Sequence, residues 1–322
     1  MKLGVIGAGA WGTALAQVCA GRGETLLWAR EPDVVAAINR DRENTLFLPG
    51  VPLSPTIRAT GSLGDLADCE ALLVVAPAQF VRVVLAEAAV GTRPLILCAK
   101  GIEAGTGKLM SEVAADLHPA APIAVLSGPS FAREVAAGKP TALTLACADA
   151  DLRAALIARL AGGALRLYGS SDVIGAEIGG AVKNVLAIAC GVVAGAGLGE
   201  NARAATIARG FAEMTRFGLA RGARAETLAG LSGLGDLVLT CGSTQSRNFA
   251  LGVGLGEGRA AAELLTDRRT VAEGAATAPV LRDAARAVGV EMPVVDAVCA
   301  LLAGTGVSEV IEALLNRPLR EE

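Results

Sequence analysis

The sequence predicts an α/β protein, with a doubly wound, mostly parallel β-sheet in the first half and an all-helical domain in the second. Up to about residue 170, short apolar runs bounded by turn residues alternate with amphipathic stretches, which is typical of βα units. Beyond residue 171 the strand signals stop, and long alanine-rich segments with helical spacing follow. Glycine is abundant, with 40 residues, and aromatic residues make up only 3%, which favours helices packed closely on a sheet over a β-sandwich.

The individual elements follow from these patterns. The expected strands are Lys2–Ile6, Thr25–Ala29, Ala71–Val75, Leu95–Ala99, Ile123–Leu126, Thr141–Cys147 and Leu165–Tyr168, with helices between them such as Trp11–Gly21 and Leu152–Leu160. The expected helices of the second half are Glu177–Ala196, Ala202–Arg221, Ala260–Leu265, Ala275–Val288 and Val294–Leu302. Because 322 residues exceed one ordinary core, we predict two domains, residues 1–171 and 172–322.

Composition excludes several classes of function. The net charge is −3 with both signs interspersed, so we expect no nucleic-acid partner. The seven cysteines form no C-x-x-C pair and only one histidine is present, so we expect no metal site, no disulfide framework and a reducing, cytoplasmic location. The uncharged stretch Val185–Gly199 is shorter than the roughly 20 residues that span a bilayer, so it predicts a buried core helix and no stable membrane insertion.

A dinucleotide fingerprint follows the first expected strand. Gly7-Ala8-Gly9-Ala10-Trp11-Gly12 fits G-x-G-x-x-G at the start of a helix, which predicts a Rossmann-type site for NAD(P)H. Arg30 stands after the second strand, where a guanidinium pairs with a 2′-phosphate, so NADP(H) is favoured, although Glu31 and Asp33 remain alternatives that would bind a ribose hydroxyl. Phe80 and Lys100 follow two further strands on the side where such sheets bind ligands.

Reduction of a ketone by hydride needs a proton donor, and the candidates are few. Tyr168 lacks a lysine four positions on, and His118 precedes a proline at an expected helix end. Lys183 lies in an otherwise apolar helix, where an ammonium is costly without a partner or a task; the alternative is a lysine that reaches the surface. Asp236, another isolated charge among glycines, is its expected partner.

A candidate phosphate site lies about ten residues further on. Ser246-Arg247-Asn248 follows a polar turn and precedes an apolar stretch, as at a helix N-terminus. Free N–H groups and an arginine fork suit a phosphate, whereas the alternative is an ordinary capping turn.

Five ordered motifs resemble the bacterial-type NAD(P)-dependent sn-glycerol-3-phosphate dehydrogenases. They are GAGAWGTALA at 7–16, GPSFAREVAAGKPTA at 128–142, DVIGAEIGGAVKNVLAIACG at 172–191, GLSGLGDLVLTC at 230–241 and SRN at 246–248. The resemblance runs from residue 2 to about 310 and implies interconversion of dihydroxyacetone phosphate and sn-glycerol 3-phosphate with NAD(P)H, for phospholipid synthesis. Two positions depart from many relatives: Ala10 stands in place of a serine and Ala99 in place of a threonine.

Site residues follow from this resemblance position by position. Lys183 is the implied catalytic lysine and Asp236 its partner, with Thr240 in the same pocket. The implied substrate contacts are Lys100, Gly128, Ser130, Lys183, Asn184, Asp236, Ser246, Arg247 and Asn248. The implied cofactor contacts, together with Gly7, Gly9 and Gly12 of the fingerprint, are Ala10, Trp11, Arg30, Phe80, Lys100, Ala132, Arg247, Val271 and Glu273.

Other functions remain open at this point. A β-hydroxyacid or 6-phosphogluconate-type dehydrogenase shares the expected architecture and also employs a lysine, although the SRN and GLGDL segments disfavour it. A non-catalytic dinucleotide sensor is a second alternative, which Lys183 within an apolar helix disfavours. The apolar helices of the second half also make a homodimer the expected assembly.

Overall fold

The computed structural model describes residues 1–266 and 272–318. Its internal contacts divide the chain into two compact units, unit 1 with residues 1–103 and 108–177, and unit 2 with residues 104–107 and 178–322. The long helix α7 (Val173–Gly195) runs across the boundary between them. The domain division at residues 171 and 172 stays a prediction, because a boundary in contacts does not test independent folding.

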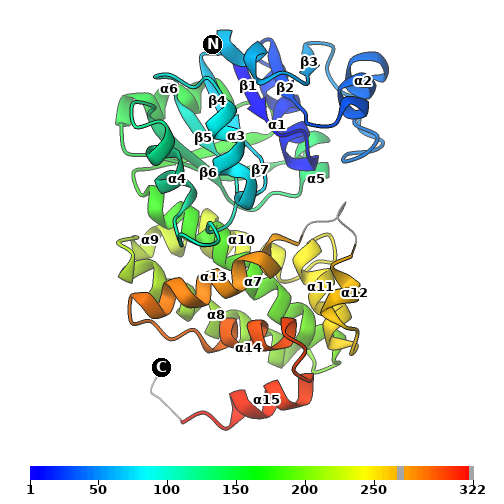
Figure 1. Cartoon of the computed structure of the whole chain (residues 1–322), viewed down its shortest axis with the longest axis vertical. Coiled ribbons are helices and arrows are strands. Elements are labelled where there is room, and N and C mark those ends of the chain that lie inside the picture. The colour runs from blue at the N-terminus through cyan, green and yellow to red at the C-terminus, as the bar shows by residue number, and fades with distance from the viewer. Residues whose placement is uncertain (267–271, 319–322) are drawn as a thin grey trace. The chain divides into compact units, whose positions relative to one another are not determined.

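Unit 1 contains a single eight-stranded sheet (Figure 1), with the strand order β3-β2-β1-β4-β5-β6-β7-β8. The strands are β1 (Leu3–Ile6), β2 (Thr25–Trp28), β3 (Ile57–Thr60), β4 (Ala71–Val74), β5 (Leu95–Leu97), β6 (Ile123–Ser127), β7 (Thr141–Cys147) and β8 (Leu165–Ser170). All neighbours pair in parallel except β6 and β7, which are antiparallel. The predicted doubly wound, mostly parallel sheet is confirmed.

One strand is missing from the sequence prediction, which expected seven. Strand β3 pairs in parallel with β2 and lies at the edge of the sheet. It has only four residues, and the exposed Arg58 lies between the buried Ile57 and Ala59. Such a short strand with a charge at its centre gives almost no hydrophobic signal, and only its pairing with β2 defines it.

Helices cover both faces of the sheet. Buried side chains of α1 (Ala10–Ala20), α2 (Pro32–Asp41) and α6 (Ala150–Leu160) join one face in a single cluster. Those of α3 (Val81–Glu87) and α4 (Met110–Leu117) pack on the opposite face. The strands are therefore buried on both sides, which explains why they are almost continuously apolar in the sequence.

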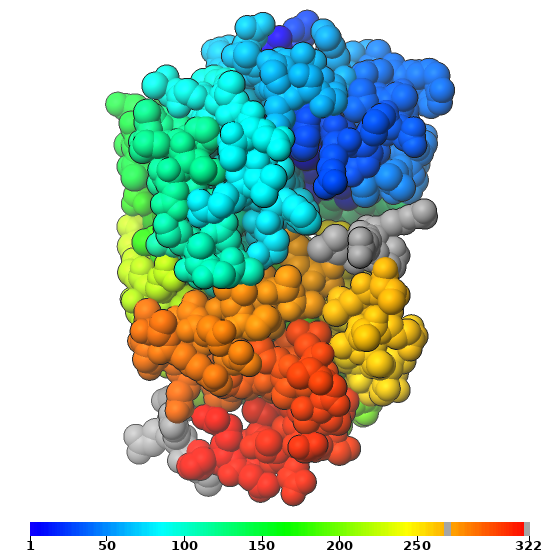
Figure 2. Space-filling model, in the orientation of Figure 1, coloured from blue at the N-terminus to red at the C-terminus, as the bar shows by residue number. Residues whose placement is uncertain are grey.

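The described residues of unit 2 form helices joined by turns and contain no strand. Besides most of α7, it contains α8 (Glu200–Ala220), α9 (Ala225–Leu228), α10 (Asp236–Thr240), α11 (Arg247–Gly256), α12 (Ala261–Leu264), α13 (Glu273–Ala287), α14 (Pro293–Leu302) and α15 (Val307–Leu315). In Figure 2, α13 in orange borders the red segment that carries α14 and α15. Helix α7 is long and apolar enough to cross a membrane by length and composition alone, but 83% of its apolar window is buried inside the structure.

A buried carboxylate holds α14 to α8. Glu213 of α8 is only 3% exposed, and it accepts hydrogen bonds from the backbone N–H groups of Val294 (2.8 Å) and Val295 (3.4 Å) in the first turn of α14. Burial raises the pKa of Glu213 to about 7, because the lost hydration outweighs the two N–H groups and the nearby Arg216.

The stability of the protein therefore depends on the ionisation of Glu213. The folded chain binds this proton more tightly than the unfolded chain, whose ordinary glutamate pKa is 4.5. The contribution of Glu213 to the free energy of unfolding thus falls as pH rises from about 4.5 to about 7, by roughly 3 kcal/mol in total.

The variant Glu213→Gln tests this dependence. We expect the free energy of unfolding of the variant, relative to wild type, to increase between pH 5 and pH 8, because glutamine carries no proton to lose. Urea denaturation at pH 5, 6, 7 and 8 measures it, with the exposed Glu257→Gln as the control that leaves the difference flat. A wild-type-to-variant difference that does not change with pH would contradict the prediction.

Candidate functional site

One group of candidate residues lies at the carboxyl edge of the sheet in unit 1. The strand order reverses direction between β1 and β4, and ligands of doubly wound sheets bind at such a point. The loop after β1 starts at Gly7, whose N–H donates to the Trp28 carbonyl (3.1 Å) and whose φ of +112° is in the left-handed region. Phe80 follows β4 at the same edge and is 51% exposed.

The glycines of this loop have different environments. A Cβ atom on Gly12 would lie 1.8 Å from the Gly7 carbonyl oxygen, so only glycine allows α1 to start so close to β1. A Cβ on Gly9 would meet nothing within 4 Å, and Gly9 is the exposed N-cap of α1 without a side-chain cap. No side chain caps the first N–H groups of α1 and no acidic side chain lies in its first turn, which fits a pyrophosphate.

The residues expected to read the ribose follow β2. Arg30 and Asp33 are exposed, and Glu31 is the N-cap residue of α2. The Trp28 indole donates to the Gly61 carbonyl (3.2 Å), which fixes the end of β2 against the loop after β3. Arg30 lies between β2 and α2, and an exposed guanidinium there suits a 2′-phosphate.

Three predicted substrate residues meet at the ends of β5 and β6. The Lys100 ammonium donates to the Gly128 carbonyl (3.3 Å), and the Ser130 hydroxyl donates to the same oxygen (3.1 Å). Parallel pairing of β5 with β6 brings these segments together. Ala132 begins the short helix α5 (Ala132–Ala136) directly after them. A cation and a hydroxyl therefore lie together at this edge, as an anionic substrate would require.

The second group of candidates lies in unit 2 and is centred on Lys183. Its ammonium donates to Asp236 Oδ1 (2.7 Å) and to Thr240 Oγ1 (2.9 Å), and the Thr240 hydroxyl donates to the Asp236 carbonyl (2.6 Å). The Lys183 side chain is 10% exposed and that of Asp236 is fully buried. The alternative of a lysine that reaches the surface is therefore wrong, and the predicted partnership with Asp236 is confirmed.

A close backbone approach brings these side chains together. A Cβ on Gly179, one turn before Lys183 in α7, would lie 2.4 Å from the Ser232 carbonyl oxygen. Ser232 belongs to a π-helical turn, Leu231–Gly235, that leads directly into Asp236 at the start of α10. Such turns recur at functional sites. Gly179 thus allows the turn that leads into α10 to approach α7 closely.

An amide pair joins three helices beside this lysine. Asn248 Nδ2 donates to Asn184 Oδ1 (3.0 Å), and Asn248 Oδ1 accepts from the Gly274 N–H (2.9 Å) at the start of α13. The pair ties α7, α11 and α13 together, and it places Glu273, the first residue of α13, close to Asn248. Asn184 and Asn248 are both buried, so this network is rigid.

The SRN segment begins α11, as the sequence predicts. Ser246 is the N-cap, and its hydroxyl accepts from the Phe249 N–H (3.3 Å). Arg247 is the first helical residue and is exposed. The SRN segment can therefore cap the helix and bind an anion at the same time, because Ser246 is the cap and the Arg247 guanidinium stays accessible.

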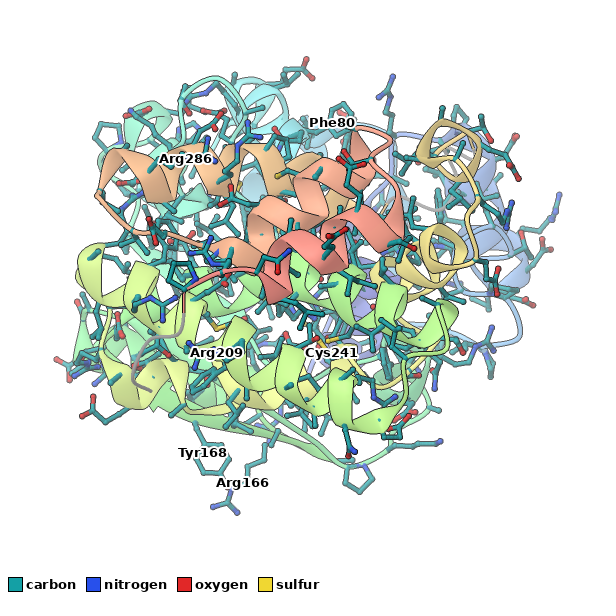
Figure 3. The ribbon with its side chains drawn as sticks, turned by 90° about the horizontal axis from the view of Figure 1, so that it is seen from below. Phe80, Arg166, Tyr168, Arg209, Cys241 and Arg286 are labelled. Carbon is teal, nitrogen blue, oxygen red and sulfur yellow. The ribbon has the colours of Figure 1, made fainter. Side chains whose placement is uncertain are left out.

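Two buried thiols, those of Cys190 and Cys241, are hydrogen-bonded to each other near Lys183. Cys190 of α7 and Cys241, which follows Thr240, are both fully buried; Cys241 lies in the interior of the helices in Figure 3. The hydrogen bond with Cys190, together with burial, raises the pKa of the Cys241 thiol well above 9. Six of the seven cysteines are buried and all are unpaired, as the sequence predicts.

Other candidates lie elsewhere or cannot be placed. Val271 falls outside the described residues. Tyr168 is 48% exposed, and Arg166 stacks on its ring at 5.1 Å; both side chains project away from the ribbon in Figure 3. His118 ends α4, and its Nε2 contacts the Leu85 carbonyl (2.8 Å). The sequence named Thr240 only as a pocket residue; its direct bond to Lys183 required knowledge of the fold.

Comparison with known proteins assigns the whole chain to one family. Residues 2–153 match the model of the NAD-dependent glycerol-3-phosphate dehydrogenase N-terminus, and residues 172–312 match that of the C-terminus. The chain belongs to the NAD-dependent glycerol-3-phosphate dehydrogenase family. This membership confirms the resemblance found in the sequence and decides against the two alternatives, a hydroxyacid-type dehydrogenase and a non-catalytic sensor.

Individual relatives agree with this assignment over the full length. Glycerol-3-phosphate dehydrogenase [NAD(P)+] 1 of Sphingopyxis alaskensis is 62% identical, covering 100% of this chain and 98% of the relative. The glycerol-3-phosphate dehydrogenase [NAD(P)+] of Erythrobacter litoralis is 60% identical with the same coverage. The crystal structure of glycerol-3-phosphate dehydrogenase from Coxiella burnetii is 38% identical with a TM-score of 0.93, covering 98% of this chain and 99% of that one.

Two glycine variants distinguish folding from ligand access in the fingerprint loop. We expect Gly12→Ala to lower the melting temperature, because its methyl group overlaps the Gly7 carbonyl. We expect Gly9→Ala to leave the melting temperature of the ligand-free protein unchanged but to weaken NADPH binding, because its methyl group occupies open space needed by the pyrophosphate. Thermal unfolding and fluorescence titration with NADPH measure both effects. Equal loss of stability in the two variants would refute this division of roles.

Proposed function

We propose that this chain interconverts dihydroxyacetone phosphate and sn-glycerol 3-phosphate with NAD(P)H, using Lys183 as the proton donor and acceptor. The observation that carries the proposal is the buried ammonium of Lys183, held by Asp236 and Thr240. The full-length relatives named glycerol-3-phosphate dehydrogenase [NAD(P)+] support the same activity. An ionised lysine is kept in an apolar environment only where it has partners or a task, and Asp236 and Thr240 are the partners here.

The residues around Lys183 account for the proton step. In the reductive direction Lys183 donates a proton to the C2 oxygen as the carbonyl becomes a hydroxyl, and in the oxidative direction it takes that proton back. Asp236 and Thr240 hold the ammonium in one position, and Asp236 compensates its charge. The hydride itself is supplied or accepted by the nicotinamide of the bound cofactor.

We propose one set of substrate contacts within unit 2 and another within unit 1. In unit 2 we assign the phosphate to Arg247, Ser246 and Asn248, at the start of α11. Asn184 supports Asn248 through the amide pair. In unit 1 we assign Lys100, Gly128 and Ser130 to the substrate, since a cation and a hydroxyl converge on one carbonyl there. Fixed donors of this kind bind the substrate and stabilise developing negative charge on oxygen.

The cofactor contacts are proposed mainly in unit 1. The loop of Gly7, Gly9, Ala10, Trp11 and Gly12 is assigned to the pyrophosphate, because no side chain caps the start of α1. Phe80, Lys100 and Ala132 follow other strands at the carboxyl edge and are assigned to the cofactor as well, together with Arg247, Val271 and Glu273. Arg30, exposed after β2, is assigned to the 2′-phosphate, so we expect NADPH to be preferred.

A rate comparison tests the proposed reaction. Initial rates are measured for dihydroxyacetone phosphate and for 3-hydroxyacids, each with the NAD and NADP forms of the cofactor. We expect turnover with dihydroxyacetone phosphate only, and a higher kcat/KM with NADPH that Arg30→Ala reverses or abolishes. Turnover of 3-hydroxyacids instead would overturn the substrate assignment.

Substitution of Lys183 tests the proposed proton donor. We expect Lys183→Ala to lower kcat by about 10²–10⁴-fold, because general acid–base catalysis contributes an effect of this size. NADPH affinity should stay near wild type, since its proposed contacts are other residues. Steady-state rates and fluorescence titration measure the two quantities, and the surface variant Lys108→Ala is the control. Activity of Lys183→Ala close to wild type would eliminate the assignment.

Substitution of Arg247 tests the proposed phosphate contact. We expect Arg247→Ala to raise KM for dihydroxyacetone phosphate by about 10–100-fold, because a hydrogen bond to a charged group contributes about 1.5–3 kcal/mol. The control is Arg259→Ala, which removes another surface arginine of unit 2 that pairs with Glu263. Steady-state kinetics measures KM, and an unchanged value would reject the contact.

The cellular setting and assembly are part of the proposal. Seven unpaired cysteines support a reducing, cytoplasmic location. Supply of glycerol 3-phosphate to phospholipid synthesis follows from the product. Exposed leucines on unit 2, including Leu198, Leu219 and Leu315, support a homodimer, which light scattering of the purified protein measures.

A further inference from the structure

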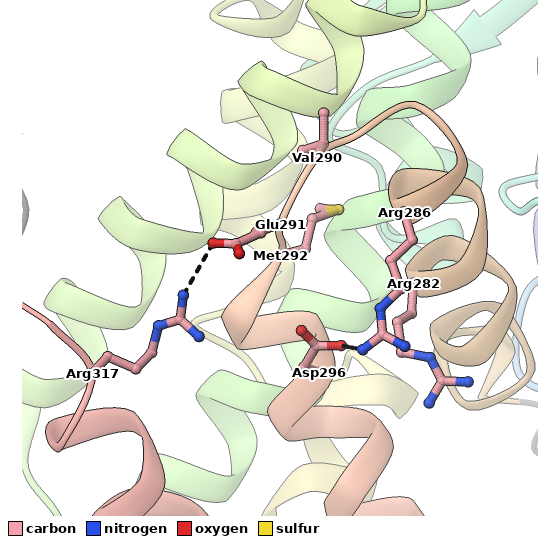
Figure 4. Close-up of a pocket in the computed structure, with 7 residues that line it drawn as sticks. All are labelled: Arg282, Arg286, Val290, Glu291, Met292, Asp296 and Arg317. Carbon is pink, nitrogen blue, oxygen red and sulfur yellow. Dashed lines mark hydrogen bonds and ion pairs between the residues drawn. The ribbon is translucent and has the colours of Figure 1, made fainter.

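A second polar pocket lies in unit 2 and involves none of the residues assigned above. Figure 4 shows its lining, which comes from the C-terminal half of α13, the connection to α14, α14 itself and the segment after α15. The lining residues are Arg282, Arg286, Val290, Glu291, Met292, Asp296 and Arg317. Its volume is about 260 Å³, which suits a small molecule rather than a nucleotide.

The pocket carries a net positive charge. Three arginines and two carboxylates line it, so the formal sum of +3 and −2 is +1. Arg286 pairs with Asp296 (2.7 Å) and Arg317 pairs with Glu291 (3.4 Å). Arg282 is different, because it pairs with Asp283 (3.0 Å), which does not line the pocket. Each guanidinium has five N–H donors, so these pairs leave capacity for another anion.

The walls of the pocket are fixed before any ligand arrives. The turn after α13 is closed by the Val290 N–H bond to the Ala285 carbonyl (2.9 Å), and Met292 beneath it is 2% exposed. Glu213 already binds the first N–H groups of α14, so an anion would contact the arginines and not the end of that helix. Arg286 and Arg317 pair with the lining carboxylates Asp296 and Glu291, which limits the positions of their exposed side chains and the entropy lost on binding.

We propose that this pocket binds a small phosphomonoester dianion at a site separate from the substrate phosphate. Arginine forks match the oxygens of a phosphate in a bidentate way, and two of them, Arg282 and Arg286, lie one turn apart on the same face of α13. The dianion binds Arg282 and Arg286, with Arg317 at the rim, and Asp296 opposes its charge. A monovalent anion gains less from three guanidinium groups, so the site selects for two negative charges.

Inorganic phosphate is the ligand used in the test. Two variants with opposite expected effects on its affinity distinguish the proposal from structural damage. Arg286→Gln and Asp296→Asn break the same ion pair, so structural damage alone would weaken phosphate binding in both. The proposal expects opposite results: Arg286→Gln weakens binding at least about five-fold, and Asp296→Asn strengthens it by about five-fold, because a neighbouring negative charge is removed. Arg282→Gln should weaken binding without breaking that pair.

The affinity is measured as the rise in melting temperature of the full-length protein with increasing phosphate, at constant ionic strength set with chloride. All variants are made in the Arg247→Ala background, so that phosphate at the substrate site does not contribute. Arg203→Gln, which removes a charge from α8 outside the pocket, is the control and should leave the affinity unchanged. Equal effects of Arg286→Gln and Asp296→Asn, or no effect of either, would overturn the proposal. Because every variant already lacks Arg247, failure here is independent of the substrate assignment.

Discussion

The buried ion pair between Lys183 and Asp236 is the interaction on which unit 2 depends. Removing both charges from water costs several kcal/mol, and only close geometry with further hydrogen bonds compensates this cost. Here the distance is 2.7 Å, and Thr240 binds the ammonium while donating to the backbone of Asp236. The pair therefore needs α7 and α10 at one fixed separation, which the contact between Gly179 and Ser232 provides. A group this constrained is suited to catalysis, because it does not have to reorganise when charge moves.

Glycine residues let backbones approach closely at three places next to candidate site residues. Gly12 lets α1 start against β1, Gly179 lets the turn before Asp236 reach α7, and a Cβ on Gly252 of α11 would lie 2.1 Å from the Ile188 carbonyl of α7. This last approach brings Asn248 to Asn184, so the amide pair depends on it. Helix α13 starts at that pair and carries Arg282 and Arg286 of the polar pocket in its C-terminal half, so it links the proposed substrate-phosphate contacts with the proposed second site.

Prediction from sequence succeeded where the polarity of a residue differed from that of its sequence neighbours. Lys183 stands out as a charge in an apolar helix and Asp236 as a charge among glycines, so both are visible without a structure. The fingerprint loop is visible because its glycines have a fixed spacing. Strand β3 and the short helices α9 and α10 were missed, because segments of four or five residues carry too little periodicity. The role of Thr240 was also beyond reach, since nothing near it in the sequence distinguishes this threonine from others.

The sequence by itself determined the fold class and the family, and it singled out the glycine-rich loop after β1 and the isolated charge of Lys183. These depend on local patterns: alternation of strands and helices, fixed glycine spacing and the cost of a lone charge among apolar residues. The tertiary structure decided which groups meet, such as Thr240 with Lys183, Asn248 with Asn184, and Glu213 with α14. These contacts join residues 57 to 81 positions apart, and only the packing of helices, which depends on the whole chain, fixes them. The physical reason is that secondary structure is encoded within a few residues, whereas distances between helices are set by side chains from every element they touch.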